Sequence, residues 1–170
     1  MKTLLSLLSR AVISKAMRRP FLLLLLSFFF AATFSSNAVE GRVIKVLPHL
    51  LDLNGKHALA PSLYDRDAYQ AYLRQHTNEI SGVRFDIQWK LKGPQFAPTL
   101  LRLELRGTAK GNLPSKSVLE TMVKPGGWFS HWTSLPITGQ NYKKFGEVTA
   151  WRATLWEGDR LIGEQKSFLW

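Results

Sequence analysis

The chain has 170 residues, of which 45% are hydrophobic and 21% charged, and it contains no cysteine. This composition fits one packed globular domain and argues against a disordered chain or a polytopic membrane protein. The lack of cysteine excludes disulfides, thiolate metal sites and cysteine nucleophiles. The net charge of +11 falls to +6 beyond the N-terminal segment, because five of the 23 basic residues precede Phe21 while all 12 acidic residues follow Val39. We therefore expect no nucleic-acid partner.

The first 38 residues have the pattern of an export signal. Basic residues at 18–19 and Pro20 precede an uncharged, apolar run at 21–34, and small polar residues lead to Ala38. A basic region, an apolar run and small side chains before the cleavage point are the three parts of a secretory signal peptide. We expect cleavage after Ala38.

A retained membrane anchor is the alternative interpretation of residues 1–38, since the apolar stretch approaches the length of a membrane span. Membrane contact would then be confined to residues 18–38. Met17 is a second candidate for the true start, because the residues from Met17 onward already form a complete signal. Both interpretations place residues 39–170 outside the cytoplasm, as a single periplasmic or extracellular domain.

The exported part begins with a strand and a helix. Residues 42–51 are β-branched and apolar at their start, and Pro48 predicts an edge strand or a strand that bends. A short helix is predicted near residues 64–77, with Ser62 or Asp65 as its N-terminal cap.

From Gly82 onward the hydrophobic period changes from helical to two. The first alternating segment has polar residues between the apolar positions Val83, Phe85, Ile87, Trp89 and Leu91. The second has arginine and glutamate between Leu101, Leu103 and Leu105. This pattern predicts two strands that each bury one face and expose the other.

Further strands are predicted at 117–123 and 131–138, the latter at an edge or a bulge because it contains Pro136. Residues 147–157 and 160–170 form the last pair, and the Gly-Asp dipeptide between them is typical of a two-residue hairpin turn. The count of about seven strands with turns between them predicts a mostly β, antiparallel sandwich.

This arrangement, over residues 82–170, resembles immunoglobulin-like and fibronectin type III-like sandwiches. Within that resemblance Tyr142, four residues before Gly146, takes the place of the corner tyrosine of such folds. The C-terminal segments 151–156 and 166–170 also resemble a recurring ending among uncharacterised exported bacterial proteins. Neither resemblance implies an activity.

No catalytic motif is present in the sequence. It lacks a Gly-x-Ser-x-Gly elbow, a phosphate-binding glycine loop and a dinucleotide fingerprint. Ser130 and His131 are adjacent, so a strand would point them to opposite faces. The four histidines, in different predicted elements, are His49, His57, His76 and His131. We therefore predict a protein that is not an enzyme, with no metal site and no cofactor.

The chain is unusually rich in tryptophan, with six residues. Trp89 and Trp151 share faces with apolar neighbours and are predicted to fill the core. Trp128 and Trp132 flank a glycine-rich loop and are the candidate binding residues. Packing and ligand binding remain alternatives for these indoles. The sequence predicts an interaction or structural protein of the cell envelope, with an envelope protein as partner; a carbohydrate-binding module is the alternative.

Overall fold

The computed structural model describes residues 39–94, 96–124 and 129–170. The predicted export signal and Trp128 lie outside the described residues. Residues Ala38–Trp170 form one compact unit. No helix in the described ranges has both the length and the apolar character that a membrane span needs.

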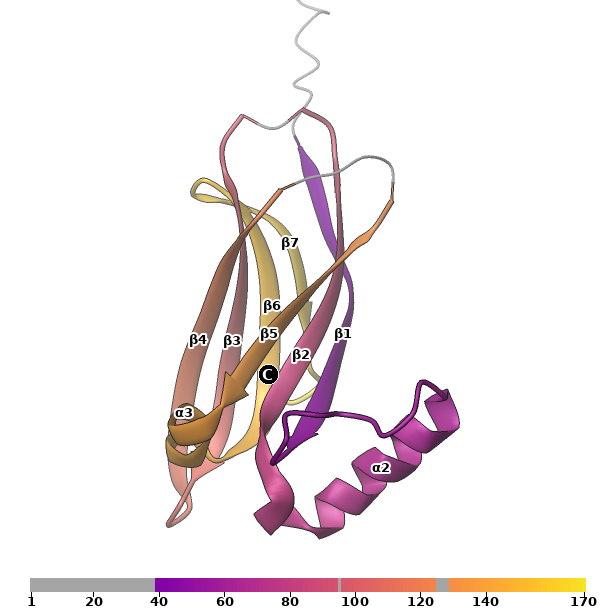
Figure 1. The fold of residues 1–170 in the computed structure, drawn as a ribbon. Helices are drawn as coiled ribbons and strands as arrows, with labels where there is room; N and C mark the ends of the chain where they lie inside the picture. Colours follow the sequence, from indigo (N-terminus) through magenta and orange to yellow (C-terminus); the bar gives the residue numbers. More distant parts are fainter. Residues whose placement is uncertain (1–38, 95, 125–128) are drawn as a thin grey trace, which may run out of the picture. The chain divides into compact units, whose positions relative to one another are not determined.

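The described residues contain seven strands in two antiparallel sheets, as the sequence predicted (Figure 1). Sheet A has the order β1-β2-β5 and sheet B the order β4-β3-β6-β7. The strands are β1 (Glu40–Asp52), β2 (Ile80–Lys92), β3 (Thr99–Ala109), β4 (Leu113–Val123), β5 (His131–Thr138), β6 (Glu147–Glu157) and β7 (Arg160–Lys166). The helices are α2 (Leu63–Gln75), the short 3₁₀ helix Thr77–Glu79 and α3 (Gly139–Phe145).

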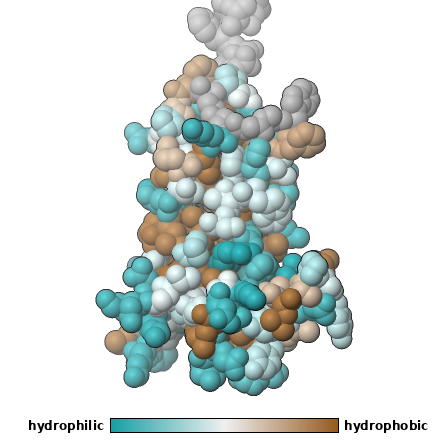
Figure 2. All heavy atoms as spheres, viewed as in Figure 1, coloured by the Kyte–Doolittle hydropathy of each residue, from teal (hydrophilic) through white to brown (hydrophobic). Residues whose placement is uncertain are grey.

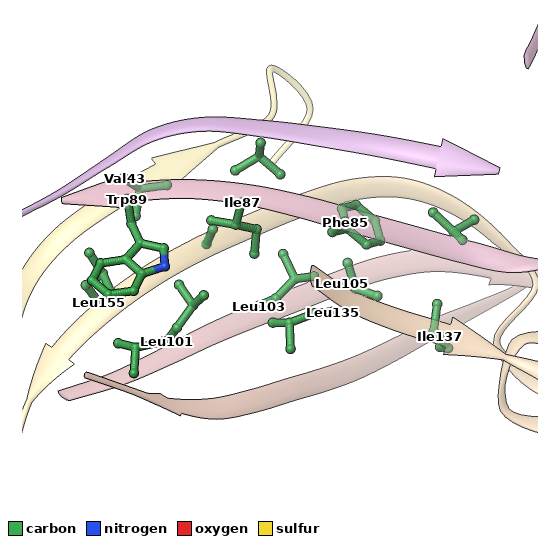
Figure 3. Packing of buried hydrophobic residues seen from close by; sticks show 14 of the residues in the cluster. Val43, Phe85, Ile87, Trp89, Leu101, Leu103, Leu105, Leu135, Ile137 and Leu155 are labelled. Atoms are coloured by element: carbon green, nitrogen blue, oxygen red, sulfur yellow. The ribbon is translucent and has the colours of Figure 1, made fainter. Parts of the chain in front are cut away.

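The core lies between the two sheets, where the alternating residues of β2 and β3 face one another (Figure 3). Phe85, Ile87, Leu101 and Leu103 are fully buried. Trp89 is buried with them, and its indole Nε1–H donates to Thr133 Oγ1 of β5 at 2.9 Å. The period-two pattern therefore fixed both the strands and their inward faces, because only alternate side chains of a strand reach the same side.

Both edges of sheet A contain a proline, as predicted. Pro48 lies in β1 and Pro136 in β5, and β2 separates these two strands. A proline has no N–H to donate to a neighbouring strand, so an edge position leaves the ladder toward β2 intact.

Helix α2 begins after Ser62, whose side chain accepts a hydrogen bond from the backbone N–H of Asp65. Its buried residues are Gln70 and Leu73. The Gln70 amide accepts from the N–H of Leu50 at 2.8 Å and donates to the carbonyl of the same residue at 2.9 Å. The side chain thus binds the edge of β1 as a neighbouring strand would, and holds the helix beside sheet A.

Three details differ from the predictions. The third strand of the alternating region starts at Leu113 rather than at residue 117, because the turn is completed by Gly111 and Asn112, both with positive φ. The last strand ends at Lys166 rather than at Trp170. Helix α3 was not predicted, since its seven residues are too few to show a helical period.

Tyr142 lies in α3, half-buried against the core. Its hydroxyl makes no hydrogen bond to any described residue, so the role of a corner tyrosine, which depends on that bond, is not met. The backbone carbonyl of Tyr142 instead accepts from the N–H of Gly146, which caps α3.

Candidate functional site

The outer face of sheet A carries a shallow depression with a volume of about 390 Å³. We call five of its polar members the polar cluster: His49, His57, Arg84, Asp86 and Ser134. Leu47, Arg66 and Trp132 complete the lining. Figure 2 shows this side of the molecule, with hydrophilic residues gathered over its lower half around α2.

The strand register brings the polar cluster together. Asp86 is on the central strand, directly opposite Ser134 of β5. Arg84, two residues earlier on the same face, is opposite His49 of β1. The fifth member, His57, comes from the loop before α2, and its backbone carbonyl accepts a hydrogen bond from Gln70 at 2.8 Å. Helix α2 therefore holds a loop histidine over the strand surface.

Asp86 is the centre of the hydrogen-bond network. Its Oδ2 accepts from Arg84 Nη2 at 2.8 Å, and its Oδ1 accepts from the Ser134 hydroxyl at 2.5 Å. His49 Nε2 lies 3.5 Å from Oδ2. Burial opposes the charge of Asp86, but the hydrogen bonds from Arg84 and Ser134 outweigh it and lower the pKa of this carboxyl. Asp86 is therefore ionised at neutral pH.

The two histidines of the polar cluster lie side by side, with ring centroids 5.2 Å apart. Desolvation by burial is the main cause that lowers the pKa of His49, against the opposing effect of Asp86. Desolvation, followed by the charge of Arg84, lowers the pKa of His57. Both imidazoles are therefore neutral at pH 7. The depression then has two arginines, Arg66 and Arg84, against a single carboxylate.

Arg84 has hydrogen-bonding capacity to spare. Its Nη2 bonds Asp86 and lies 3.4 Å from His57 Nε2, whereas its Nε–H is buried without a partner among the described residues. A buried N–H that is not bonded is energetically unfavourable.

The polar cluster is arranged for binding better than for hydrolysis. In a Ser-His-Asp triad the imidazole stands between the other two groups and takes the proton from serine. Here the carboxylate of Asp86 stands between Ser134 and His49, and its lowered pKa makes it a weak general base. In the described part of the chain, no group of three or more histidine or acidic side chains is placed to hold a metal ion.

Trp132, one of the two candidate binding residues, is on this face and is 51% exposed. It lies two residues before Ser134 on β5, opposite Gln88 of β2. The structure thus brings Trp132 next to a polar cluster that sequence reasoning missed. The second candidate, Trp128, lies outside the described residues, so its place relative to Trp132 stays a prediction.

The other indoles are packed or paired with arginines. Trp89 is in the core and Trp151 is half-buried against it, as predicted. On the outer face of sheet B, the guanidinium of Arg102 lies 5.5 Å from the ring of Trp156. The ring of Trp170 lies 4.1 Å from the guanidinium of Arg106 and 5.4 Å from that of Arg152.

The signal that would have revealed the polar cluster is the outward-facing run of β2. The period-two pattern predicts that Arg84, Asp86 and Gln88 share the exposed face of this strand. Opposite charges two residues apart on a central strand, beside a strand with an exposed indole, are a stronger indication of a site than either feature alone.

Comparison with known proteins adds little to this geometry. No protein-family model and no curated protein matches the chain. A solved structure of an immunoglobulin-like protein from Pseudomonas aeruginosa is similar to it, with 16% sequence identity and a TM-score of 0.33. The match covers 78% of this chain and 97% of the other. The assignment of a β-sandwich follows from the two sheets themselves, and the likeness brings no ligand, partner or activity.

Proposed function

We propose that this protein is an exported, non-catalytic binding protein of the cell envelope, and that it recognises a partner protein with the outer face of sheet A. The observation that carries the proposal is the half-exposed indole of Trp132 beside the polar cluster. Tryptophan and arginine are the residues most enriched among those that dominate binding energy at protein interfaces. Trp132 would supply apolar contact area, and Arg66 and Arg84 would supply charged donors.

The cellular location rests on the N-terminal sequence. The basic residues at 18–19 and the apolar run at 21–34 support export by a signal peptide, with a retained anchor as the alternative. In either case the partner would be an envelope protein that presents an acceptor-rich surface to Arg84. Mass spectrometry of the exported protein tests this part: a mature chain that begins at Val39 supports cleavage, whereas an intact leader supports the anchor.

Affinity capture with a matched pair of variants tests the recognition surface. Immobilised residues 39–170 should retain an envelope protein from a bacterial envelope extract, in a saturable manner. Trp132→Ala should lose that protein, and Trp156→Ala, on the opposite sheet, should retain it. If both variants retain the protein equally, the outer face of sheet A is not the recognition surface.

A glycan is the second candidate ligand, because an exposed indole next to hydrogen-bonding side chains is a common way to hold a sugar ring. Asp86 and Arg84 lie beside Trp132 and offer an acceptor and a donor. Affinity-gel retardation by an immobilised glycan should be lost in both Trp128→Ala and Trp132→Ala. Retardation that survives both substitutions would rule out the indoles as the sugar platform.

A further inference from the structure

A second hollow lies away from the outer face of sheet A, where the two sheets separate near helices α2 and α3. Its volume is about 940 Å³, close to the upper end of the range for small-molecule pockets. Both helices lie at the same end of the sandwich (Figure 1). The apolar part of the lining consists of Pro48, Leu50, Ile80, Val83, Val148 and Trp151, with the ring of Tyr142.

The hollow exists because β7 is shorter than its neighbour β6. The register between these strands ends at the pair Arg152 and Lys166, so the first residues of β6 have no β7 beside them. Further along, β1 and β7 are in close contact: a Cβ added at Gly163 would lie 2.8 Å from the carbonyl oxygen of Gly41. The edge of the sandwich between β1 and β7 is therefore closed near Gly41 and Gly163 and open near the first residues of β6.

The opening exposes part of the core. Leu50, Tyr142, Val148 and Trp151 all pack against the main hydrophobic cluster but are only partly buried. Each therefore has one side on the core and another side on the hollow. Apolar surface of this kind gains free energy when a ligand removes it from water, by roughly 25 cal/mol per Å².

The polar part of the lining is cationic. Arg74, from the last turn of α2, and Lys143, from α3, are exposed and line the hollow. Neither forms an ion pair with any carboxylate in the described ranges. Glu147 is the only acidic residue of the lining, so the net charge around the hollow is +1. An apolar interior with unpaired cations at its margin is complementary to an amphipathic anion.

We propose that this hollow binds an amphipathic molecule with a single alkyl chain and an anionic head group. The chain lies between the sheets against Leu50, Val148 and Trp151, and the head group contacts Arg74 and Lys143. The site is separate from the recognition surface on sheet A, and either one can fail without the other.

Calorimetric titration of residues 39–170 with straight-chain carboxylates tests the proposal. Octanoate, nonanoate and decanoate, below their micelle concentrations, should bind with one-to-one stoichiometry. Each added methylene should tighten binding about fourfold, the factor that corresponds to burial of one CH₂. Absence of saturable decanoate binding, or an affinity that does not depend on chain length, would overturn it.

A matched pair of substitutions locates the site. Val148→Trp places a large ring in the hollow, whereas Val118→Trp makes the same change on the outer face of β4, where the valine is exposed. We expect decanoate affinity to fall at least tenfold in the first variant and to stay unchanged in the second. Circular dichroism and a thermal melt confirm that both are folded. Equal affinities in the two folded variants would show non-specific binding and refute the site.

The head-group contact has its own test. The double substitution Arg74→Gln and Lys143→Gln should weaken decanoate about fivefold, since two exposed charge pairs are lost. Decyl maltoside, which has the same chain and a neutral head, should bind both proteins with the same affinity. If the double variant binds decanoate as tightly as the unmodified protein, the hollow has no preference for anions and this part of the proposal is wrong.

Discussion

The two outer faces of the sandwich both carry arginine and tryptophan side chains, but these side chains have different partners on each face. On sheet B the arginines are paired: Arg102 bonds Glu120, Arg152 bonds Glu104, and the rings of Trp156 and Trp170 lie against the guanidinium groups. On sheet A, Arg84 also bonds a carboxylate, that of Asp86, but its Nε–H is buried without a described partner. There Trp132 has no cation over its ring in the described residues.

The difference shows that an exposed indole is informative only together with its neighbours. The tryptophans of sheet B lie against arginine side chains, so these indoles already have partners within the fold. The indole of sheet A is half-exposed and lies next to Arg84, whose Nε–H has no described partner. Tryptophan content alone therefore does not identify a binding surface; an indole that no described cation covers, next to a polar group without a described partner, makes a face a candidate for one.

Removal of the central carboxylate from each face should give the largest contrast. Asp86→Asn takes the charged partner from Arg84 and weakens the bond to Ser134, so the free energy of unfolding should fall by about 2 kcal/mol. Glu104→Gln removes one ion pair from sheet B and should cost about 0.5 kcal/mol. Urea unfolding of the two variants measures both values. Equal losses would mean that the polar cluster is no more than another surface ion pair.

Acid should destabilise sheet A through its histidines. The folded pKa values of His49 and His57 lie below 6.5, so the unfolded chain binds more protons than the folded chain just below that pH. Stability should therefore decrease as the pH falls from about 7 through 6.5 toward the folded pKa values. Urea midpoints between pH 7.5 and 5 should show this decrease, and His57→Gln should reduce it. An unchanged pH dependence in His57→Gln would contradict the assignment.

Trp170, whose ring lies against the arginines of sheet B, should contribute less to the free energy of unfolding than the Asp86 carboxylate. Trp170→Ala removes the ring that lies against Arg106 and Arg152, and a loss of about 1 kcal/mol is expected. Thermal and urea unfolding measure it. Trp170→Phe keeps an aromatic face and should recover part of the loss, whereas no recovery would contradict a role for the aromatic face.

The smallest effect on stability should come from Trp132→Ala. Its ring is half-exposed and lies under no described cation, so the free energy of unfolding should change by less than about 0.5 kcal/mol. The same variant should lose partner binding, and this separation of stability from binding distinguishes the two faces. A loss of stability as large as that of Trp170→Ala would mean that Trp132 is a packing residue.

The sequence was sufficient for the strands and the fold class because that information is local. Alternation at 83–91 and 101–105 specifies strands and inward faces, and Pro48 and Pro136 specify edges. Helix α3 was not predicted because Gly139–Phe145 is a short segment between the end of β5 and the start of β6. Short helices owe more to tertiary packing than to their own propensity.

The candidate site was predicted only in part, because it depends on register. Trp132 was recognised from its type and its place beside a glycine-rich loop. The contact between Asp86 and Ser134 joins residues 48 apart, and it follows only once β5 is paired with β2 in this alignment. A slip of one residue would send Ser134 to the core. Single-sequence periodicity defines the face of each strand but not its partner.

The prolines at both margins of sheet A restrict how another molecule can engage it. A partner that extends a sheet by adding its own strand needs a continuous row of N–H donors along the margin. Pro48 interrupts that row on β1 and Pro136 interrupts it on β5. Backbone addition is therefore disfavoured on both sides, which also protects the chain against self-assembly through these margins. The recognition proposed for sheet A would then proceed through side chains on its outer face.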